Sequence, residues 1–231
     1  MEQPQEIRGE ERPYGRRTFL AVTAAGLSSL VWAEPAWRLV SGAARPLQDA
    51  LPAGIVPSGW RIYTVASSMP RFDPATWRLR VEGEVASPLS LSYDELRRLP
   101  RAEQVSTFHC VTGWSVKNVH WAGVRFSDVL AAAQPSAAAH ALTFVSAEQP
   151  YTDSLTLEQA RLGDTMLAYE MDGKPLSRAH GAPVRVVIPE MYGYKNVKWV
   201  ERIVVSANAD AGYWEQRGYD VDAWVGKSNG Y

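Results

Sequence analysis

The residue most able to do chemistry in this sequence is its single cysteine, Cys110, within the segment 108–115. One thiol cannot form an intramolecular disulfide, so Cys110 is a buried packing residue, a nucleophile or a ligand of a transition metal. A nucleophilic thiol needs a histidine close in space, and the chain has four, at positions 109, 120, 140 and 180. His109 is adjacent in sequence, but consecutive side chains of a strand point to opposite faces, so its adjacency gives no support. The segment by itself leaves all three roles open.

A second segment, residues 178–202, is basic although the whole chain is nearly neutral. It contains two acidic residues and five basic ones: Arg178, Arg185, Lys195, Lys198 and Arg202. An apolar run at 186–188 leads to the loop 192–198, which contains Gly193 and two lysines three residues apart. Backbone N–H groups and lysine ammonium groups can surround an anion. The loop predicts a phosphate site formed by Lys195 and Lys198, and a solvated basic loop is the alternative.

Composition and missing motifs exclude several classes of protein. The chain has 231 residues, 46% hydrophobic and 21% charged, with a formal net charge of -1, as in an ordinary globular protein. A nucleic-acid-binding domain normally carries a strong basic excess, so we expect no nucleic-acid partner. The zinc-protease, Cys-x-x-Cys, nucleophile-elbow and dinucleotide-binding motifs are all absent. Gly226-Lys227-Ser228 resembles the end of a phosphate loop, but Val221 occupies the position of the required earlier glycine.

The N-terminal region has the pattern of an export signal. Two adjacent arginines, Arg16 and Arg17, precede a short, weakly apolar, Ala-rich stretch, and no apolar run is long enough for an ordinary membrane-spanning helix. The pair resembles a twin-arginine signal, which exports folded proteins and predicts a periplasmic or otherwise exported location. Two chance arginines in an ordinary N-terminus are the alternative. We predict an export signal at residues 1–43, a linker at 44–59 and one domain at 60–231.

The remaining chain contains several strand signals. Residues 77–81 alternate apolar and basic side chains, which is typical of a strand with one wet face. The apolar runs 184–188 and 199–205 predict buried strands. Asp172-Gly173 predicts a tight hairpin turn, because glycine accepts a positive φ.

Short helices are predicted between these strands. Ser92 with Glu95, and Thr156 with Gln159, have the spacing of capping boxes, and Ser127 precedes an Ala-rich third helix. Short strands mixed with short helices, without regular βαβ spacing, predict an α+β fold.

The Cys110 segment and the basic segment together resemble the molybdopterin-binding domain of the sulfite oxidase superfamily, over roughly residues 60–215. The matching features are Cys110, His180-Gly-Ala-Pro-Val-Arg185 and Tyr192-Gly-Tyr-Lys-Asn-Val-Lys-Trp199, in this order. The resemblance implies the fold of that domain, with mixed sheets and short helices. It also implies a molybdenum–molybdopterin cofactor whose metal is ligated by Cys110, and an active-site role for Tyr151 near the metal's oxo group or the substrate oxygen.

The resemblance assigns further residues to the cofactor. His180 and Arg185 match residues that contact the pterin and its phosphate. The other matches lie in the phosphate loop, in an N-terminal contact segment and at a hydroxyl position: Lys195, Asn196, Val197, Lys198, Tyr63, Thr64 and Ser146. Trp114 and Trp121 are candidates for pocket walls, with a plain core role as the alternative.

Within this superfamily the sequence is similar to two groups. Residues 167–199 resemble sulfite oxidases, whereas the Cys110 segment is similar to the periplasmic methionine sulfoxide reductase catalytic subunit. No arginine lies close before Cys110 to bind an anionic substrate, since Arg101 is nine residues away. We therefore predict an enzyme that transfers an oxygen atom in a two-electron reaction and reduces a sulfoxide-type substrate, either a small molecule or carried by a protein.

Two alternatives to this function stay open. One is a sulfite dehydrogenase that passes electrons to a cytochrome, and the other is a non-catalytic cofactor-binding protein. For the enzyme we expect a redox partner, with a membrane haem protein as one candidate.

Overall fold

The computed structural model describes residues 59–230, and β-strands form most of their regular structure. The strands are β1 (Leu79–Gly83), β2 (Leu89–Leu91), β3 (Arg101–His109), β4 (Ser115–Arg125), β5 (Ala141–Ser146), β6 (Thr152–Thr156), β7 (Met166–Met171), β8 (Lys174–Pro175), β9 (Arg185–Val187) and β10 (Val200–Ser206). The helices are α2 (Tyr93–Arg98), α3 (Phe126–Ala133), α4 (Leu157–Ala160) and the 3-10 turns η1 (Arg178–His180) and η2 (Glu215–Arg217). Within this described part, no helix combines the length and apolarity needed to cross a membrane. The predicted export signal and all but the last residue of the predicted linker lie outside the described residues.

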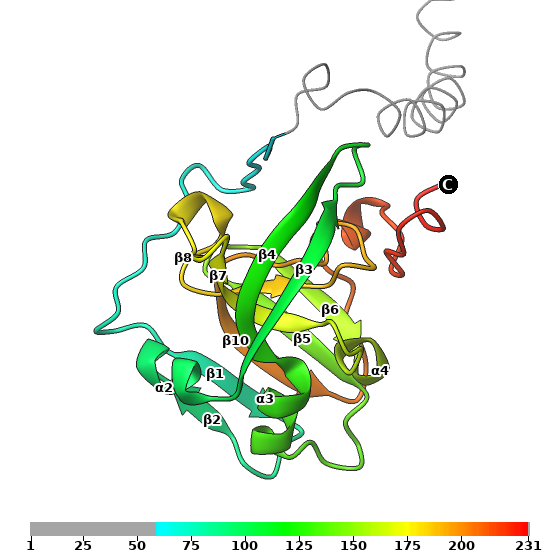
Figure 1. Cartoon of the computed structure of the whole chain (residues 1–231). Helices are drawn as coiled ribbons and strands as arrows, with labels where there is room; N and C mark the ends of the chain where they lie inside the picture. Colours follow the sequence, from blue (N-terminus) through cyan, green and yellow to red (C-terminus); the bar gives the residue numbers. More distant parts are fainter. Residues whose placement is uncertain (1–58, 231) are drawn as a thin grey trace, which may run out of the picture. The chain divides into compact units, whose positions relative to one another are not determined.

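The strands form two sheets. The first has the order β2-β1-β10-β5-β6, in which β1 and β10 run parallel and the other neighbours run antiparallel. The second has the order β3-β4-β7-β8, with β9 paired to β7, and is antiparallel throughout. Figure 1 shows α2 and α3 at one end of the sheets and the turn between β3 and β4 at the opposite end. The α+β prediction is confirmed.

The larger hydrophobic core lies between the two sheets. Leu79, Phe144 and Val205 of the first sheet and Val124 and Leu167 of the second all belong to one buried cluster. Each of these side chains is at most 1% exposed. Burial of this apolar area is the main stabilising contribution to the fold.

The second sheet is buried on both faces, because successive side chains of β7 point in opposite directions. Leu167 and Tyr169 belong to the larger core, whereas Met166 and Ala168 belong to a smaller cluster on the other face. Trp60 packs against this smaller cluster. The start of the described chain is therefore held against the second sheet.

The predicted local elements are largely confirmed. Both capping boxes are present, at the starts of α2 and α4, and the Asp172-Gly173 turn joins β7 to β8. The third helix begins at Phe126 with Arg125 as its N-cap, so the prediction that it starts after Ser127 is wrong. Phe126 is fully buried in the larger core, and its packing fixes the start of α3 without a side-chain cap.

Gly123 is a point of close contact between β4 and β7. A Cβ atom at this position would lie 2.0 Å from the Leu167 carbonyl oxygen and 2.7 Å from Ala168 Cα. We expect Gly123→Ala to lower the free energy of unfolding by roughly 1–3 kcal/mol, because backbone atoms must move to admit the methyl group. Gly163→Ala is the matched control, since nothing lies within 4 Å of its Cβ position. Denaturant unfolding of both variants measures the difference, and equal stabilities would contradict the close contact.

Candidate cofactor site

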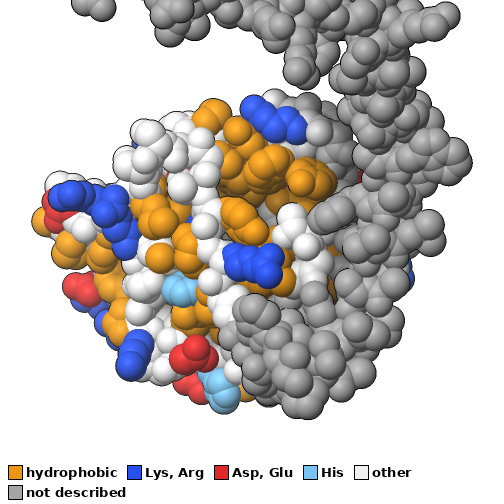
Figure 2. Space-filling view, turned by 90° about the horizontal axis from the view of Figure 1, so that it is seen from above, with side chains coloured by type: hydrophobic (Ala, Val, Ile, Leu, Met, Phe, Trp, Pro, Cys, Tyr) orange, Lys and Arg blue, Asp and Glu red, His pale blue; other side chains and the backbone are white. Residues whose placement is uncertain are grey.

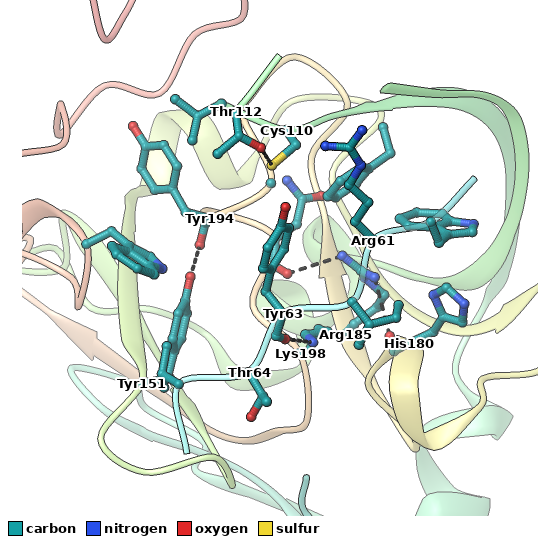
Figure 3. Close-up of a pocket in the computed structure, with 18 of the residues that line it drawn as sticks. Arg61, Tyr63, Thr64, Cys110, Thr112, Tyr151, His180, Arg185, Tyr194 and Lys198 are labelled. Carbon is teal, nitrogen blue, oxygen red and sulfur yellow. Dashed lines mark hydrogen bonds between the residues drawn. The ribbon is translucent and has the colours of Figure 1, made fainter. Parts of the chain in front are cut away.

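A cavity of about 380 Å³ lies beside the turn between β3 and β4 (Figure 3). Its walls come from the segments 60–65, 108–114, 179–198 and 213–219, with Glu148 and Tyr151 between them. It is lined by most of the predicted site residues: Tyr63, Thr64, Cys110, Tyr151, His180, Arg185, Asn196 and Lys198. The fold thus brings the cysteine segment and the basic segment to one cavity.

Cys110 lies in the tight turn that joins β3 to β4. Its backbone N–H donates to the Trp114 carbonyl at 2.9 Å, and the Gly113 N–H donates to the Cys110 carbonyl at 3.1 Å. Gly113 has a φ of 87°, which glycine adopts without the steric cost of a side chain. The half-buried thiol lines the cavity, with its sulfur 3.2 Å from Thr112 Oγ1. These contacts fix the position of the thiol.

The basic loop 192–198 packs directly against this turn. The Gly193 N–H donates to the His109 carbonyl at 2.7 Å. A Cβ atom at position 193 would lie 2.3 Å from Phe108 Cζ, so a glycine is required for the close approach. Two motifs that are distant in sequence are therefore adjacent in space.

Arg185 is a buried cation without a carboxylate partner among residues 59–230. Its guanidinium donates only to the backbone carbonyls of Val186, His180 and Asn196, each at 3.3 Å. Burial lowers the pKa of Arg185 to about 10, so the group is still charged at neutral pH. A buried charge of this kind favours an anionic group in the same cavity.

Lys198 adds a second cation to the cavity. Its Nζ donates to the Tyr63 carbonyl at 2.6 Å and lies 4.0 Å from the centre of the Trp199 ring. Burial, and next the charge of Arg185, lower the pKa of Lys198 to about 8, and Glu148 acts in the opposite direction. The side chain carries a proton at neutral pH and loses it in mildly basic solution.

His180 and Trp114 contribute polar nitrogens that have no hydrogen-bond partner within the described part of the chain. These atoms, His180 Nδ1 and Trp114 Nε1, are buried, and both residues line the cavity. Burial, followed by the charges of Arg185 and Lys198, lowers the pKa of His180 to about 4, so the imidazole is neutral at pH 7. Unsatisfied buried polar atoms are costly, which indicates that a polar ligand completes this cavity.

One wall of the cavity is the segment 60–66, which is held by side chains and not by strand pairing. The buried carboxylate of Glu148 accepts hydrogen bonds from Thr64 Oγ1, from the Val65 N–H at 2.8 Å and from the Ala66 N–H at 3.3 Å. Tyr63 and Thr64, which the resemblance matches to an N-terminal contact segment, lie in this wall of the cavity. Sequence reasoning missed Glu148, because no motif marks it.

Lys195 is not in this cavity, which corrects the prediction that its ammonium group meets the phosphate. Its side chain is 2% exposed, and the residue does not line the cavity. Its Nζ forms ion pairs with Asp153, at 2.8 Å, and with Glu215. These two buried carboxylates hold the Lys195 ammonium group outside the cavity. The spacing of the two lysines in the sequence could not reveal these partners.

The side chains of three other residues that were predicted to contact the cofactor make hydrogen bonds or packing contacts within the protein. Ser146 does not line the cavity; its Oγ donates to the Lys198 carbonyl at 2.8 Å and accepts from the Glu148 N–H at 2.9 Å. Val197 belongs to the larger core. Asn196 lines the cavity, but its amide bonds backbone groups, accepting from the Ile188 N–H at 2.8 Å. Ser146 and Val197 therefore shape the loop without lining the cavity, and Asn196 lines the cavity with its amide engaged by the backbone.

Sequence reasoning also missed an aromatic wall and a cation. Tyr213, Trp214 and Tyr219 follow the last strand and line the cavity, and Arg61 joins them from the start of the described chain. The density of aromatic residues after β10 was the available signal for the wall. Of the two tryptophans considered, Trp114 lines the cavity, whereas Trp121 is a buried residue of the smaller cluster.

The donor set fits a metal that is held by an organic chelate. Among residues 59–230, no group of three or more His, Cys, Asp or Glu side chains could hold a metal ion. Cys110 would supply one thiolate, and the other ligands would come from a non-protein group. Arg185, Lys198 and the unpaired nitrogens of His180 and Trp114 suit the anionic tail and polar edge of such a group.

These features define a molybdopterin-binding oxidoreductase, and the comparison with protein families agrees. Residues 66–214 match the model described as the oxidoreductase molybdopterin binding domain, and the chain belongs to this family. It is a molybdopterin-dependent oxidoreductase with molybdenum–molybdopterin as its cofactor, as the resemblance of the sequence predicted. The non-catalytic alternative is thereby set aside.

The chain is similar in sequence to proteins that carry several different names. The chain is 36% identical over 154 residues to the uncharacterized oxidoreductase YuiH of Bacillus subtilis, covering 66% of this chain and 77% of the relative. It is 35% identical over 156 residues to a putative protein-methionine-sulfoxide reductase subunit, YedZ1, of Azospira oryzae, covering 68% and 58%. It is 33% identical over 180 residues to the mitochondrial sulfite oxidase of Rattus norvegicus, covering 65% and 33%. The chain thus spans about a third of that sulfite oxidase.

A solved structure supports the fold. The sulfane dehydrogenase SoxCD from Paracoccus pantotrophus aligns with a TM-score of 0.57 and 26% sequence identity. The alignment covers 62% of this chain and 41% of that one. The predicted molybdopterin-binding fold with mixed sheets and short helices is confirmed.

Lys198 provides a test of the anion site. We expect Lys198→Met to reduce cofactor retention at pH 7, because the loop loses a charge that faces the cavity. For the unmodified chain, retention falls as the pH rises above about 8, where Lys198 loses its proton, and the variant shows no such fall at that pH. Molybdenum and pterin content after dialysis at several pH values measures both effects. Full retention by the variant at every pH would contradict the assignment.

Proposed function

We propose that this enzyme transfers an oxygen atom in a two-electron reaction and reduces a sulfoxide-type substrate in the cavity at Cys110. The observation that carries the proposal is the aromatic, largely uncharged wall beside the thiol. Phe108, Trp114 and Tyr219 line the cavity together with Cys110. In the view of Figure 3, Lys198 lies on the opposite side of the cavity from Cys110. A neutral oxo compound would bind at the apolar side near Cys110, and the cofactor would bind at the side that carries the cations.

The mouth of the cavity is apolar as well. Ile62 and Tyr63 line it and are 37% and 53% exposed. Figure 2 shows hydrophobic side chains gathered on the face that is seen from above, with separate Lys and Arg side chains between them. An apolar cavity mouth favours a substrate with apolar substituents, because binding of that substrate removes apolar surface from water.

Sulfoxide reduction consumes two electrons and two protons, and it yields a sulfide and one water molecule. The bound cofactor supplies the two-electron redox chemistry of this oxygen transfer. The side chains of the protein bind and orient the substrate and exclude water.

We propose that the Tyr151 hydroxyl turns from the Tyr194 carbonyl to donate its one hydrogen bond to the substrate oxygen when the substrate binds. Its phenol lines the cavity and donates to the Tyr194 carbonyl at 2.7 Å. Burial, and next the charges of Asp153 and Glu148, raise the pKa of Tyr151 well above its ordinary value, so the phenol keeps its proton at neutral pH. A protonated phenol is a donor and not a base, which suits an oxygen atom that leaves the substrate as water.

Sulfite oxidation is the second candidate, and Arg61 favours it. This exposed arginine lines the same cavity as Cys110, although it is far from Cys110 in the sequence. A guanidinium can bind a sulfite oxyanion through paired hydrogen bonds. The names of the relatives include both activities, so the substrate must be decided by assay.

Electron supply and location are parts of the same proposal. The reduction needs two electrons from outside the chain, and we propose a redox partner protein, with a membrane haem protein as the first candidate. We also propose that the protein is exported through the twin-arginine route, on the basis of Arg16 and Arg17.

Cys110→Ala tests the role of the thiol. We expect the variant to lose turnover of methionine sulfoxide with a reduced dye as electron donor, because the metal loses its protein ligand. The thiol is only half-buried, so the unfolding midpoint stays near that of the unmodified enzyme. Activity and thermal unfolding measured side by side check the prediction, and unchanged turnover would remove the ligand role.

Arg61→Gln separates the two substrate classes. If the enzyme reduces sulfoxides, the KM for methionine sulfoxide changes by less than about twofold, because an exposed charge contributes little to binding a neutral ligand. Arg71→Gln is the control, since Arg71 is an exposed arginine that does not line the cavity. Turnover of sulfite with an oxidised acceptor, with a KM that rises about tenfold in Arg61→Gln alone, would establish the second candidate instead.

A further inference from the structure

We propose that the segment 212–219 is a specificity-determining wall, in which Trp214 and Tyr219 select sulfoxides that carry an apolar or aromatic substituent. This inference rests on the proposed function and names the substrate class of the same cavity. The family match ends at residue 214, so Tyr219 belongs to the part of this chain beyond the matched region. Its side chain nevertheless lines the cavity together with Tyr213 and Trp214.

The rings of this wall form a continuous series. Tyr213 stacks on Tyr151 with ring centroids 5.5 Å apart, and Trp214 meets Tyr213 edge-on at 5.2 Å. Trp214 also meets Tyr219 edge-on at 5.2 Å, and Tyr219 stacks on Tyr194 at 5.4 Å. Contacts at these distances hold each ring against its neighbours, so the wall presents a defined aromatic surface and not a set of mobile side chains.

The wall ends in the same cavity as the thiol, because Tyr219 and Cys110 both line it. At the other end, Tyr213 stacks on Tyr151, the residue that we assign to the substrate oxygen. A sulfoxide held between Cys110 and Tyr151 therefore directs one of its substituents toward Trp214 and Tyr219.

The backbone of the wall is fixed by the buried ion cluster around Lys195. Lys195 belongs to the basic loop 192–198, and its Nζ pairs with Glu215 and with Asp153 of β6. The second oxygen of Glu215 accepts the Gly212 N–H at 2.7 Å. The Tyr213 N–H donates to the Thr152 carbonyl at 2.8 Å. Lys195 and Glu215 are thus positioning residues, which hold the wall against the loop that binds the cofactor.

The chemistry of the wall defines its substrate preference. Aromatic faces and edges bind apolar groups and soft sulfur atoms favourably and offer no charge to an oxyanion. The cation beside the wall, Arg217, lies over the Tyr213 ring at 3.6 Å but does not line the cavity. An aryl sulfoxide therefore gains more from this wall than a small dialkyl sulfoxide does.

The test compares two probes, methyl phenyl sulfoxide and dimethyl sulfoxide, on the molybdenum-loaded enzyme with a reduced dye. We expect Trp214→Ala to raise the KM for the aryl probe, relative to that for the dialkyl probe, by about fivefold, because one aromatic contact is lost. Trp214→Phe keeps an aromatic ring and retains most of the preference. Val221→Ser is the control just after this segment, since Val221 is 59% exposed and does not line the cavity.

Glu215→Ala tests the positioning role. The substitution frees the Gly212 N–H and removes one partner of Lys195, while Asp153 still pairs with this lysine. We expect it to change the ratio of the two KM values in the same direction as Trp214→Ala does, and to change kcat less than it changes this ratio. We also expect acrylamide to quench the tryptophan fluorescence of this variant more strongly. If this variant does not fold, the Trp214 variants still decide the proposal.

The outcomes separate the two levels of the argument. A molybdenum-loaded enzyme that reduces neither of these probes nor methionine sulfoxide overturns the proposed function, and one that reduces methionine sulfoxide alone overturns the specificity wall. An enzyme that reduces both, but whose KM ratio is unchanged in Trp214→Ala, overturns the specificity wall. A changed ratio in Trp214→Ala with an unchanged ratio in Glu215→Ala overturns the positioning role of the ion cluster.

Discussion

The site depends on one close contact, in which the Gly193 N–H donates to the His109 carbonyl and Phe108 leaves no room for a Cβ atom at position 193. This contact joins the cysteine-bearing turn of the second sheet to the basic loop 192–198, which leads into β10 of the first sheet. The Cys110 thiol and the cations are far apart in the sequence, and neither segment forms the cavity alone. A bulkier residue at position 193 would separate them, and the cavity would lose the relation between its sulfur and its charges.

Two buried cations, Arg185 of β9 and Lys195 of the basic loop, have different surroundings and therefore different roles. Lys195 is neutralised inside the protein by Asp153 and Glu215, so it contributes to the architecture and holds the C-terminal wall. Arg185 is equally buried, but it bonds only carbonyl groups, which leaves its charge to be balanced by a ligand. The distribution of buried carboxylates, and not the distribution of basic residues, therefore decides which cation serves the cofactor.

The sequence was sufficient for the features that depend on local patterns. The capping boxes of α2 and α4 and the Asp172-Gly173 turn are found as predicted, and most of the predicted site residues line one cavity with Cys110. It was insufficient where a distant partner decides the outcome. Lys195 and Lys198 are both lysines of one loop, and only the folded chain shows that two carboxylates surround the first. Arg61 and Tyr219 reach the cavity from the two ends of the described chain, and no spacing in the sequence links them to Cys110.

The central position of β10 in the first sheet has a consequence for how a nascent chain acquires this structure. β10 lies between β1 and β5 and pairs in parallel with β1, although the two strands come from opposite ends of the domain. The first sheet stays split until the chain has been synthesised through β10, and a topology with such non-local pairings folds slowly. The basic loop 192–198 directly precedes β10, so a nascent chain that stops before β10 has no finished cavity, and the pterin can be loaded only after β10 has been made.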